Sequence, residues 1–75
     1  MMAGKRQQAH HYYSVFIDVP GQVELQWFGY SERIAAWQFY KAVLAAARKP
    51  GAYAVDLRQD GQELASVPIK QAAIA

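Results

Sequence analysis

The chain has 75 residues, 53% of them hydrophobic and 19% charged, and a formal net charge of +2. This composition predicts one small globular domain and excludes a disordered chain, and no apolar run approaches the roughly 18 residues that a membrane-spanning helix needs. From Tyr12 onward six basic and six acidic residues cancel, so the excess positive charge lies in Lys5 and Arg6. The chain contains no cysteine, which excludes disulfides, thiolate metal sites and a cysteine nucleophile.

The first eleven residues show no hydrophobic periodicity, and they predict a flexible basic N-terminal arm over residues 1–11. No apolar segment follows Lys5 and Arg6, so we expect no secretory signal and a cytoplasmic protein. At the other end, residues 70–75 are polar and rich in alanine and predict a C-terminal tail. Residues 12–69 remain as a single domain.

Apolar and polar residues alternate from Tyr12 to Tyr30, on both sides of Pro20-Gly21, and predict a β-hairpin. Opposed residues of an antiparallel pair share one face. A two-residue loop would set Ile17 against Glu24, so the pattern favours a three-residue connection, or a bulge. The favoured register pairs Val19 with Val23, Ile17 with Leu25 and Val15 with Trp27. It also gathers four aromatic rings on the opposite face, those of Tyr12, Phe16, Phe28 and Tyr30.

The next segment predicts a helix over Ser31–Lys49, because Ser31 is a good N-cap residue and Pro50-Gly51 stops a helix. Its apolar arc covers more than half of the circumference. The centre of the arc consists of Ala36, Phe39, Tyr40, Val43 and Ala47, and Ala35, Ala42 and Ala46 lie at one edge. The opposite strip is basic and contains Lys41, Arg48 and Lys49.

One face of a small sheet cannot cover so wide an arc. We therefore expect part of the helix flank to be covered by a partner or by a second copy of the chain. The leading residues for this contact are Trp37, Tyr40 and Leu44.

The segment Tyr53–Ile69 predicts a second hairpin, since Asp60-Gly61 suits a two-residue type I′ turn. The predicted pairs are Arg58 with Glu63, Leu57 with Leu64 and Val55 with Ser66. Pro68 cannot donate a main-chain hydrogen bond, so this last strand is expected at an edge, with a bulge. The order ββαββ predicts an α+β fold, a four-stranded antiparallel sheet of two hairpins with one connecting helix.

No arrangement of residues predicts catalysis, a cofactor or a metal site. His10 and His11 are adjacent, so their side chains point apart, and no third ligand has suitable spacing. Asp18 and Glu24 could face each other across the first hairpin as paired acids. Because both carboxylates would lie close to a loop and in water, we expect them to repel each other weakly rather than to act as a general acid and base. We expect a protein that is not an enzyme.

The ββαββ order, the small size and the lack of cysteines and catalytic residues resemble small accessory proteins of phages and mobile elements, including some anti-CRISPR proteins, over Tyr12–Ile69. No shared motif carries this resemblance. It implies a non-enzymatic inhibitor that sterically blocks a larger protein or nucleoprotein complex, sometimes as a homodimer. The expected contact residues are Tyr12, Phe16, Phe28, Tyr30, Trp37, Tyr40, Leu44, Lys41, Arg48 and Lys49. The alternative is a nucleic-acid-binding module that uses the sheet aromatics and the basic arm.

Overall fold

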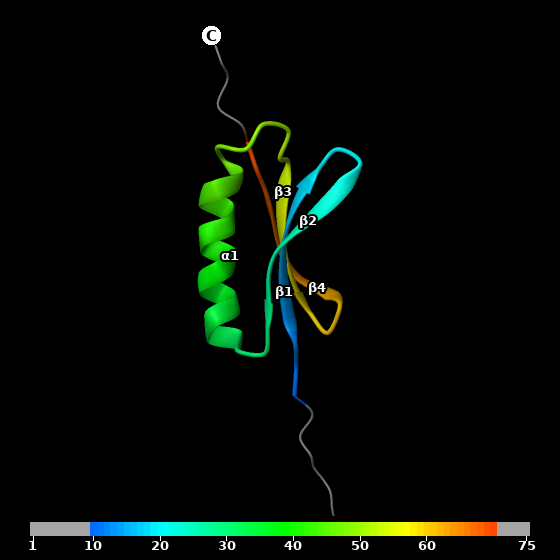
Figure 1. Ribbon diagram of the computed structural model, residues 1–75, viewed down its shortest axis with the longest axis vertical. Helices are drawn as coiled ribbons and strands as arrows, with labels where there is room; N and C mark the ends of the chain where they lie inside the picture. The colour runs from blue at the N-terminus through cyan, green and yellow to red at the C-terminus, as the bar shows by residue number, and fades with distance from the viewer. Residues whose placement is uncertain (1–9, 71–75) are drawn as a thin grey trace, which may run out of the picture.

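The computed structural model describes residues 10–70, which form four strands and one helix (Figure 1). The elements are β1 (Tyr13–Val19), β2 (Gln22–Gly29), α1 (Glu32–Ala46), β3 (Ala54–Gln59) and β4 (Gln62–Pro68). The predicted α+β fold of two hairpins with one connecting helix is confirmed. Residues 1–9 of the predicted arm and residues 71–75 of the predicted tail lie outside the described residues.

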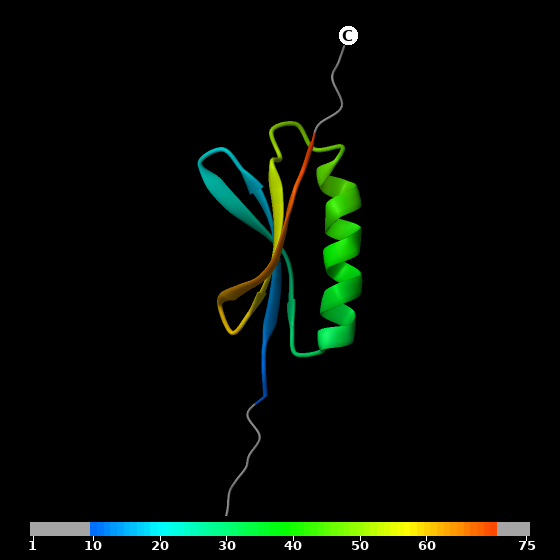
Figure 2. The ribbon, with the colours of Figure 1, turned by 180° about the vertical axis from the view of Figure 1, so that it is seen from behind.

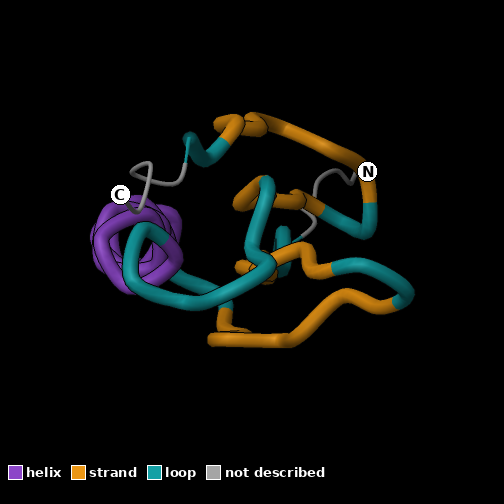
Figure 3. Tube along the Cα trace, turned by 90° about the horizontal axis from the view of Figure 1, so that it is seen from above, coloured by secondary structure: helices purple, strands orange, loops and turns teal. Residues whose placement is uncertain are grey.

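The four strands form one antiparallel sheet in the order β2-β1-β3-β4, so β1 and β3 are the central strands. α1 packs across β1, β3 and β2 on one face of this sheet, and the view from above shows the helix to one side of the strands (Figure 3). The tips of both hairpins curve away from α1 in two opposite views (Figures 1 and 2). We call the sheet face away from α1 the open face, since no other element of the described chain covers it.

α1 lies on the sheet through a line of alanines. Ala35, Ala42 and Ala46 share one helix face and are all buried, and Ala35 is 0% exposed. Phe39 and Val43 pack partly buried beside them, over the core side chains of β1 and β3. Small side chains let the helix axis approach the strands closely, so the line of alanines sets the distance between the two layers.

The predicted centre of the helix's apolar arc is therefore wrong in part. Ala36, Tyr40 and Ala47 are exposed, whereas the alanines predicted at the edge of the arc contact the sheet. The physical reason is shape: the face with the smallest side chains fits flush on the sheet, although another face has more apolar surface. The large apolar side chains are consequently turned outward.

The N-terminal end of α1 agrees with the prediction, whereas its C-terminal end comes three residues earlier than predicted. Ser31 is the N-cap, and its hydroxyl oxygen accepts a hydrogen bond from the main-chain N–H of Ile34 at 3.1 Å. The helix ends at Ala46 rather than at Lys49. The N–H groups of Arg48 and Lys49 donate to carbonyls three residues back, which tightens the chain into turns.

For the first hairpin the expected three-residue connection is wrong, and the alternative, a bulge, is confirmed. Only Pro20 and Gly21 connect β1 with β2, and Gly21 adopts a φ of +86°, which glycine reaches without strain. The predicted pairs Val19–Val23 and Ile17–Leu25 are wrong. The observed pairs are Val19–Gln22, Ile17–Glu24 and Phe16–Leu25.

A β-bulge restores the alternation in the second half of β2. Gln26 has no partner on β1, and beyond it Val15 pairs with Trp27 as predicted. Trp27 packs against the core. On the turn side of the bulge, Val23 and Leu25 pair with open-face positions of β1, and both are about half exposed or more. The bulge thus places two aliphatic side chains on the open face instead of in the core.

The second hairpin has the predicted turn. Asp60 and Gly61 both have positive φ, 54° and 84°, and Arg58 pairs with Glu63 as predicted. Two predicted pairs, Leu57–Leu64 and Val55–Ser66, are wrong, because Leu64 is a bulged residue without a partner. The observed pairs are Leu57–Ala65 and Val55–Val67. β4 lies at an edge of the sheet, as expected from Pro68.

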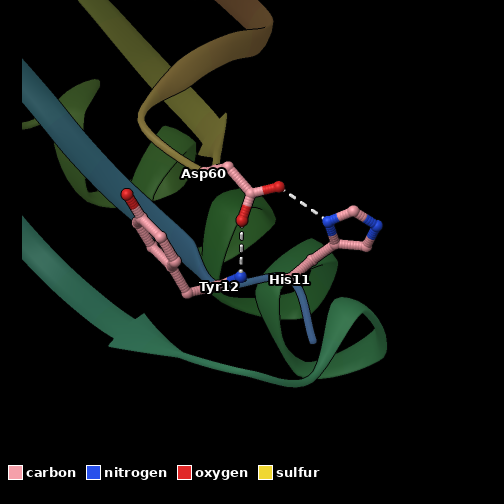
Figure 4. Close-up of polar contacts among 3 residues, drawn as sticks. All are labelled: His11, Tyr12 and Asp60. Atoms are coloured by element: carbon pink, nitrogen blue, oxygen red, sulfur yellow. Dashed lines mark hydrogen bonds and ion pairs between the residues drawn. The ribbon is translucent and has the colours of Figure 1, made fainter. Parts of the chain in front are cut away.

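The turn of the second hairpin also holds the start of β1 (Figure 4). The Asp60 carboxylate accepts a hydrogen bond from the main-chain N–H of Tyr12 at 3.1 Å and lies 2.6 Å from Nδ1 of His11. Two contacts lower the pKa of Asp60 below its usual value, and the one with His11 has a larger effect than the hydrogen bond from the Tyr12 N–H. His11, which was predicted in the flexible arm, is thus held against the sheet.

Candidate interaction surfaces

The outer side of α1 carries three large apolar side chains. Trp37, Tyr40 and Leu44 are each more than half exposed, and the rings of Trp37 and Tyr40 stack with centroids 5.6 Å apart. We call these three residues the α1 ridge. They stand on the helix side opposite the buried alanines, since a helix turns by about 100° per residue. The sequence identified all three residues, and the structure leaves them uncovered in the single chain.

Three cations surround the α1 ridge. Arg33, Lys41 and Arg48 are exposed and each lies four residues from a ridge residue in the sequence, Arg33 and Lys41 within α1 and Arg48 in the turn after it. Lys41 and Arg48 were predicted as rim charges, whereas Arg33 was missed, although its spacing of four residues from Trp37 was visible in the sequence. Lys49, also predicted, lies apart: its Nζ is 3.0 Å from the Glu24 carboxylate. That contact lowers the pKa of Glu24.

The open face carries an aromatic row at one end. The ring of Phe28 contacts Tyr12 and Tyr30, with centroids 5.7 and 5.5 Å apart. Phe16, predicted in the same group, is set apart. The guanidinium of Arg58 lies over its ring, 4.5 Å from the centroid, and the side chain is half-buried. Three of the four predicted sheet aromatics therefore form one exposed group.

Two carboxyl groups lie buried on the open face of the central strands. Asp18 on β1 and Asp56 on β3 are only 8% and 7% exposed. Burial is the largest cause that raises the pKa of Asp18 to about 6, and the neighbouring Asp56 carboxyl, which disfavours the ionised form, acts in the same direction. We call these residues the acid pair.

The surroundings of the two acids differ. Asp56 accepts a hydrogen bond from the Ser66 hydroxyl at 2.8 Å, and Nη2 of Arg58 lies 3.7 Å from its other oxygen. Oδ1 of Asp18 is buried, and no group of the described chain donates a hydrogen bond to it. The suggested pairing of Asp18 with Glu24 is wrong, because the two-residue turn and the register place Glu24 on the helix face, beside Lys49.

Among the described residues, the α1 ridge and the open face do not contain the ligands of a metal site. Within residues 10–70 no group of three histidine, aspartate or glutamate side chains comes together in a way that could hold a metal ion. The one helix of this region is neither long nor apolar enough to cross a membrane. Compared with protein-family models, curated proteins and solved structures, the chain matches none.

Proposed function

We propose that this protein is a small non-enzymatic binding protein that docks on a protein partner through the α1 ridge and blocks the partner's surface by occupying it. The observation that supports this proposal is the orientation of α1. The helix turns its alanines to the sheet and presents Trp37, Tyr40 and Leu44 outward. The apolar surface of these three side chains stays in contact with water in the single chain, and a partner that covered it would remove that surface from water, which favours docking.

The spacing of the ridge residues fits a known mode of recognition. Positions 37, 40 and 44 follow the i, i+3, i+7 pattern of a helix whose anchors enter an apolar groove. Tryptophan and tyrosine are also the side chains that contribute most to binding energy in protein interfaces. Because α1 is fixed on a sheet, it would bind with little loss of conformational entropy.

The charges around the ridge indicate the chemistry of the partner. Arg33, Lys41 and Arg48 form a basic rim, and the nearest acid on the helix, Glu32, lies in the first turn. Two copies of this chain that met ridge to ridge would bring like charges together, which opposes a homodimer at this surface. The complementary partner is a protein with an apolar groove that is rimmed by carboxylates.

Photo-crosslinking in the native host tests this proposal. A benzophenone amino acid replaces Tyr40, which is 54% exposed, and the matched control carries it at Tyr53, which is 55% exposed and precedes β3. We expect one discrete protein adduct from position 40 and none from position 53. The same adduct from both positions, or none from position 40, would contradict the proposal.

With the captured partner purified, titration calorimetry measures the ridge directly. Trp37→Ala should weaken binding by about 30-fold or more, the effect of a central anchor of about 2 kcal/mol. Ile34→Ala on the same helix, 46% exposed and outside the ridge, should leave binding within about threefold. Equal effects of the two substitutions would argue against the ridge as the binding site.

A second candidate function is binding of single-stranded nucleic acid by the aromatic row. It is supported by the exposed, contiguous rings of Tyr12, Phe28 and Tyr30, on which bases could stack. Titration with single-stranded RNA and DNA at two salt concentrations tests it. A steep loss of affinity with salt would support phosphate contacts, whereas no binding at low salt would dismiss this function.

A further inference from the structure

The acid pair connects the two halves of the fold. The first hairpin contains β1 and β2, the second contains β3 and β4, and within the sheet the two hairpins meet only where β1 pairs with β3. Asp18 pairs with Ala54, so Asp56 lies two residues farther along β3 on the same face. The contact between the two side chains therefore crosses the boundary between the hairpins.

The surroundings of the pair leave one oxygen of Asp18 without a hydrogen-bond donor in the described chain. Ser66 and Arg58 both interact with Asp56, and Oδ1 of Asp18 has no donor in the described chain. Two ionised carboxylates cannot hydrogen-bond to each other, because each can only accept. A proton on Asp18 would make this side chain a hydrogen-bond donor to Asp56, and it would remove the repulsion between the two carboxylates.

We propose that Asp18 and Asp56 share one proton, and that uptake of this proton as the pH falls below neutral strengthens the pairing of β1 with β3. The proton comes from water and sits on Asp18, which donates it in a hydrogen bond to the Asp56 carboxylate. The device is an acid-responsive link between the hairpins, separate from the α1 ridge on the other side of the sheet.

The neighbouring charges act on this link from two strands. Arg58 on β3 favours the ionised form of Asp18, whereas Asp56 on β3 and Glu63 on β4 oppose it. From β2, the residue paired with Asp18 is Val23, which carries no charge. Burial is the largest cause of the raised pKa of Asp18, and its folded value of about 6 compares with 3.8 for an exposed aspartate.

The sign of the pH effect follows from this difference. A group whose pKa is higher in the folded state contributes full stability below its unfolded pKa and loses it as the pH rises through the folded value. For Asp18 this window lies between about pH 4 and 6. Acidification from pH 7.5 to 5.0 should therefore raise the folding equilibrium constant about tenfold.

Carboxyl-carbon NMR of the purified protein tests the shared proton, with urea unfolding as the second measurement. The Asp18 signal should titrate near pH 6, and Asp56→Asn should move this midpoint toward 3.8. Asp18→Asn, whose amide can donate to Asp56 at every pH, should remove the tenfold pH effect and raise the folding constant at pH 7.5. The Tyr53 N–H, which donates to the main-chain oxygen of Asp18 at 2.9 Å, reports local opening by hydrogen exchange.

Three outcomes would overturn the proposal. The first is an Asp18 midpoint near 4 in the unaltered protein, and the second is a midpoint that Asp56→Asn leaves unchanged. The third is an Asp18→Asn protein that is less stable than the unaltered chain at pH 7.5 while it still folds. If a variant fails to fold, a midpoint near 4 in the unaltered protein still overturns the proposal.

Discussion

The line of alanines on α1 leads to a sharp prediction about the distance between helix and sheet. Ala35 is 0% exposed and belongs to the core cluster, whereas its neighbour Ala36 is exposed. We compare Ala35→Leu with Ala36→Leu, which add the same atoms at adjacent positions of the same helical turn. Only the first substitution forces extra atoms between the two layers.

The size of the effect follows from packing. Extra methylene groups in a close-packed core typically cost about 1–3 kcal/mol, because side chains leave their preferred rotamers or the backbone shifts. A chain of this length has a total stability of about 4–11 kcal/mol, so a loss of 2 kcal/mol is a large fraction of it. The same loss lowers Tm by about 8–16 °C. Ala36→Leu should change stability by less than about 0.5 kcal/mol.

Urea unfolding followed by far-UV circular dichroism measures both variants. We expect a lower midpoint for Ala35→Leu with an unchanged m-value, which reports a change in stability rather than in the surface exposed on unfolding. Equal midpoints for the two variants would falsify the claim that α1 packs closely against the sheet through its alanines. A lower midpoint for Ala36→Leu alone would show that a different helix face contacts the sheet.

The remaining predictions concern local features. Ser31→Ala removes the N-cap acceptor of α1 and should cost about 1 kcal/mol in urea unfolding, whereas Ser31→Asp should retain most of the stability. Gly29→Ala should also lower the unfolding midpoint, because a Cβ at this position collides with the indole of Trp27, and near-UV circular dichroism should show the displaced ring. Glu24→Gln removes a partly exposed ion pair with Lys49 and should shift the urea midpoint only slightly, and 0.5 M salt should reduce this shift further.

Local signals predicted the elements of this fold well. The positive-φ turn at Asp60-Gly61 and the cap at Ser31 each depend on residues close in sequence, and each is confirmed. The apolar face of β1 lies in the core as its alternation predicts, but Ser14 and Asp18 on the other face are buried as well, because β1 is a central strand.

The errors in strand pairing come from the two bulges, and the buried face of α1 and its end at Ala46 were also predicted wrongly. A bulge was an option for the first hairpin and was expected in the last strand, but its position, at Gln26 or Leu64, has no local marker, because its benefit comes from which side chains reach the core.

The candidate sites also divide into one that local sequence reveals and one that depends on residues far apart in the sequence. The helix flank with Trp37, Tyr40 and Leu44 was found because a wide apolar arc is a property of the helix alone. The acid pair was missed, since Asp18 and Asp56 are 38 positions apart and meet only through the pairing of β1 with β3. Strand order could not be read from the sequence, so the true partner of Asp18 could not be either.

The strand order has a consequence for how the chain folds. Each hairpin closes through a two-residue turn, but β1 and β3 join residues 36 to 46 positions apart, such as Asp18 with Ala54 and Tyr13 with Gln59. The largest loop closure in the described chain therefore accompanies the pairing of β1 with β3. We expect the rate of folding to depend on this pairing step, with α1 serving as the tether that keeps the two hairpins near each other.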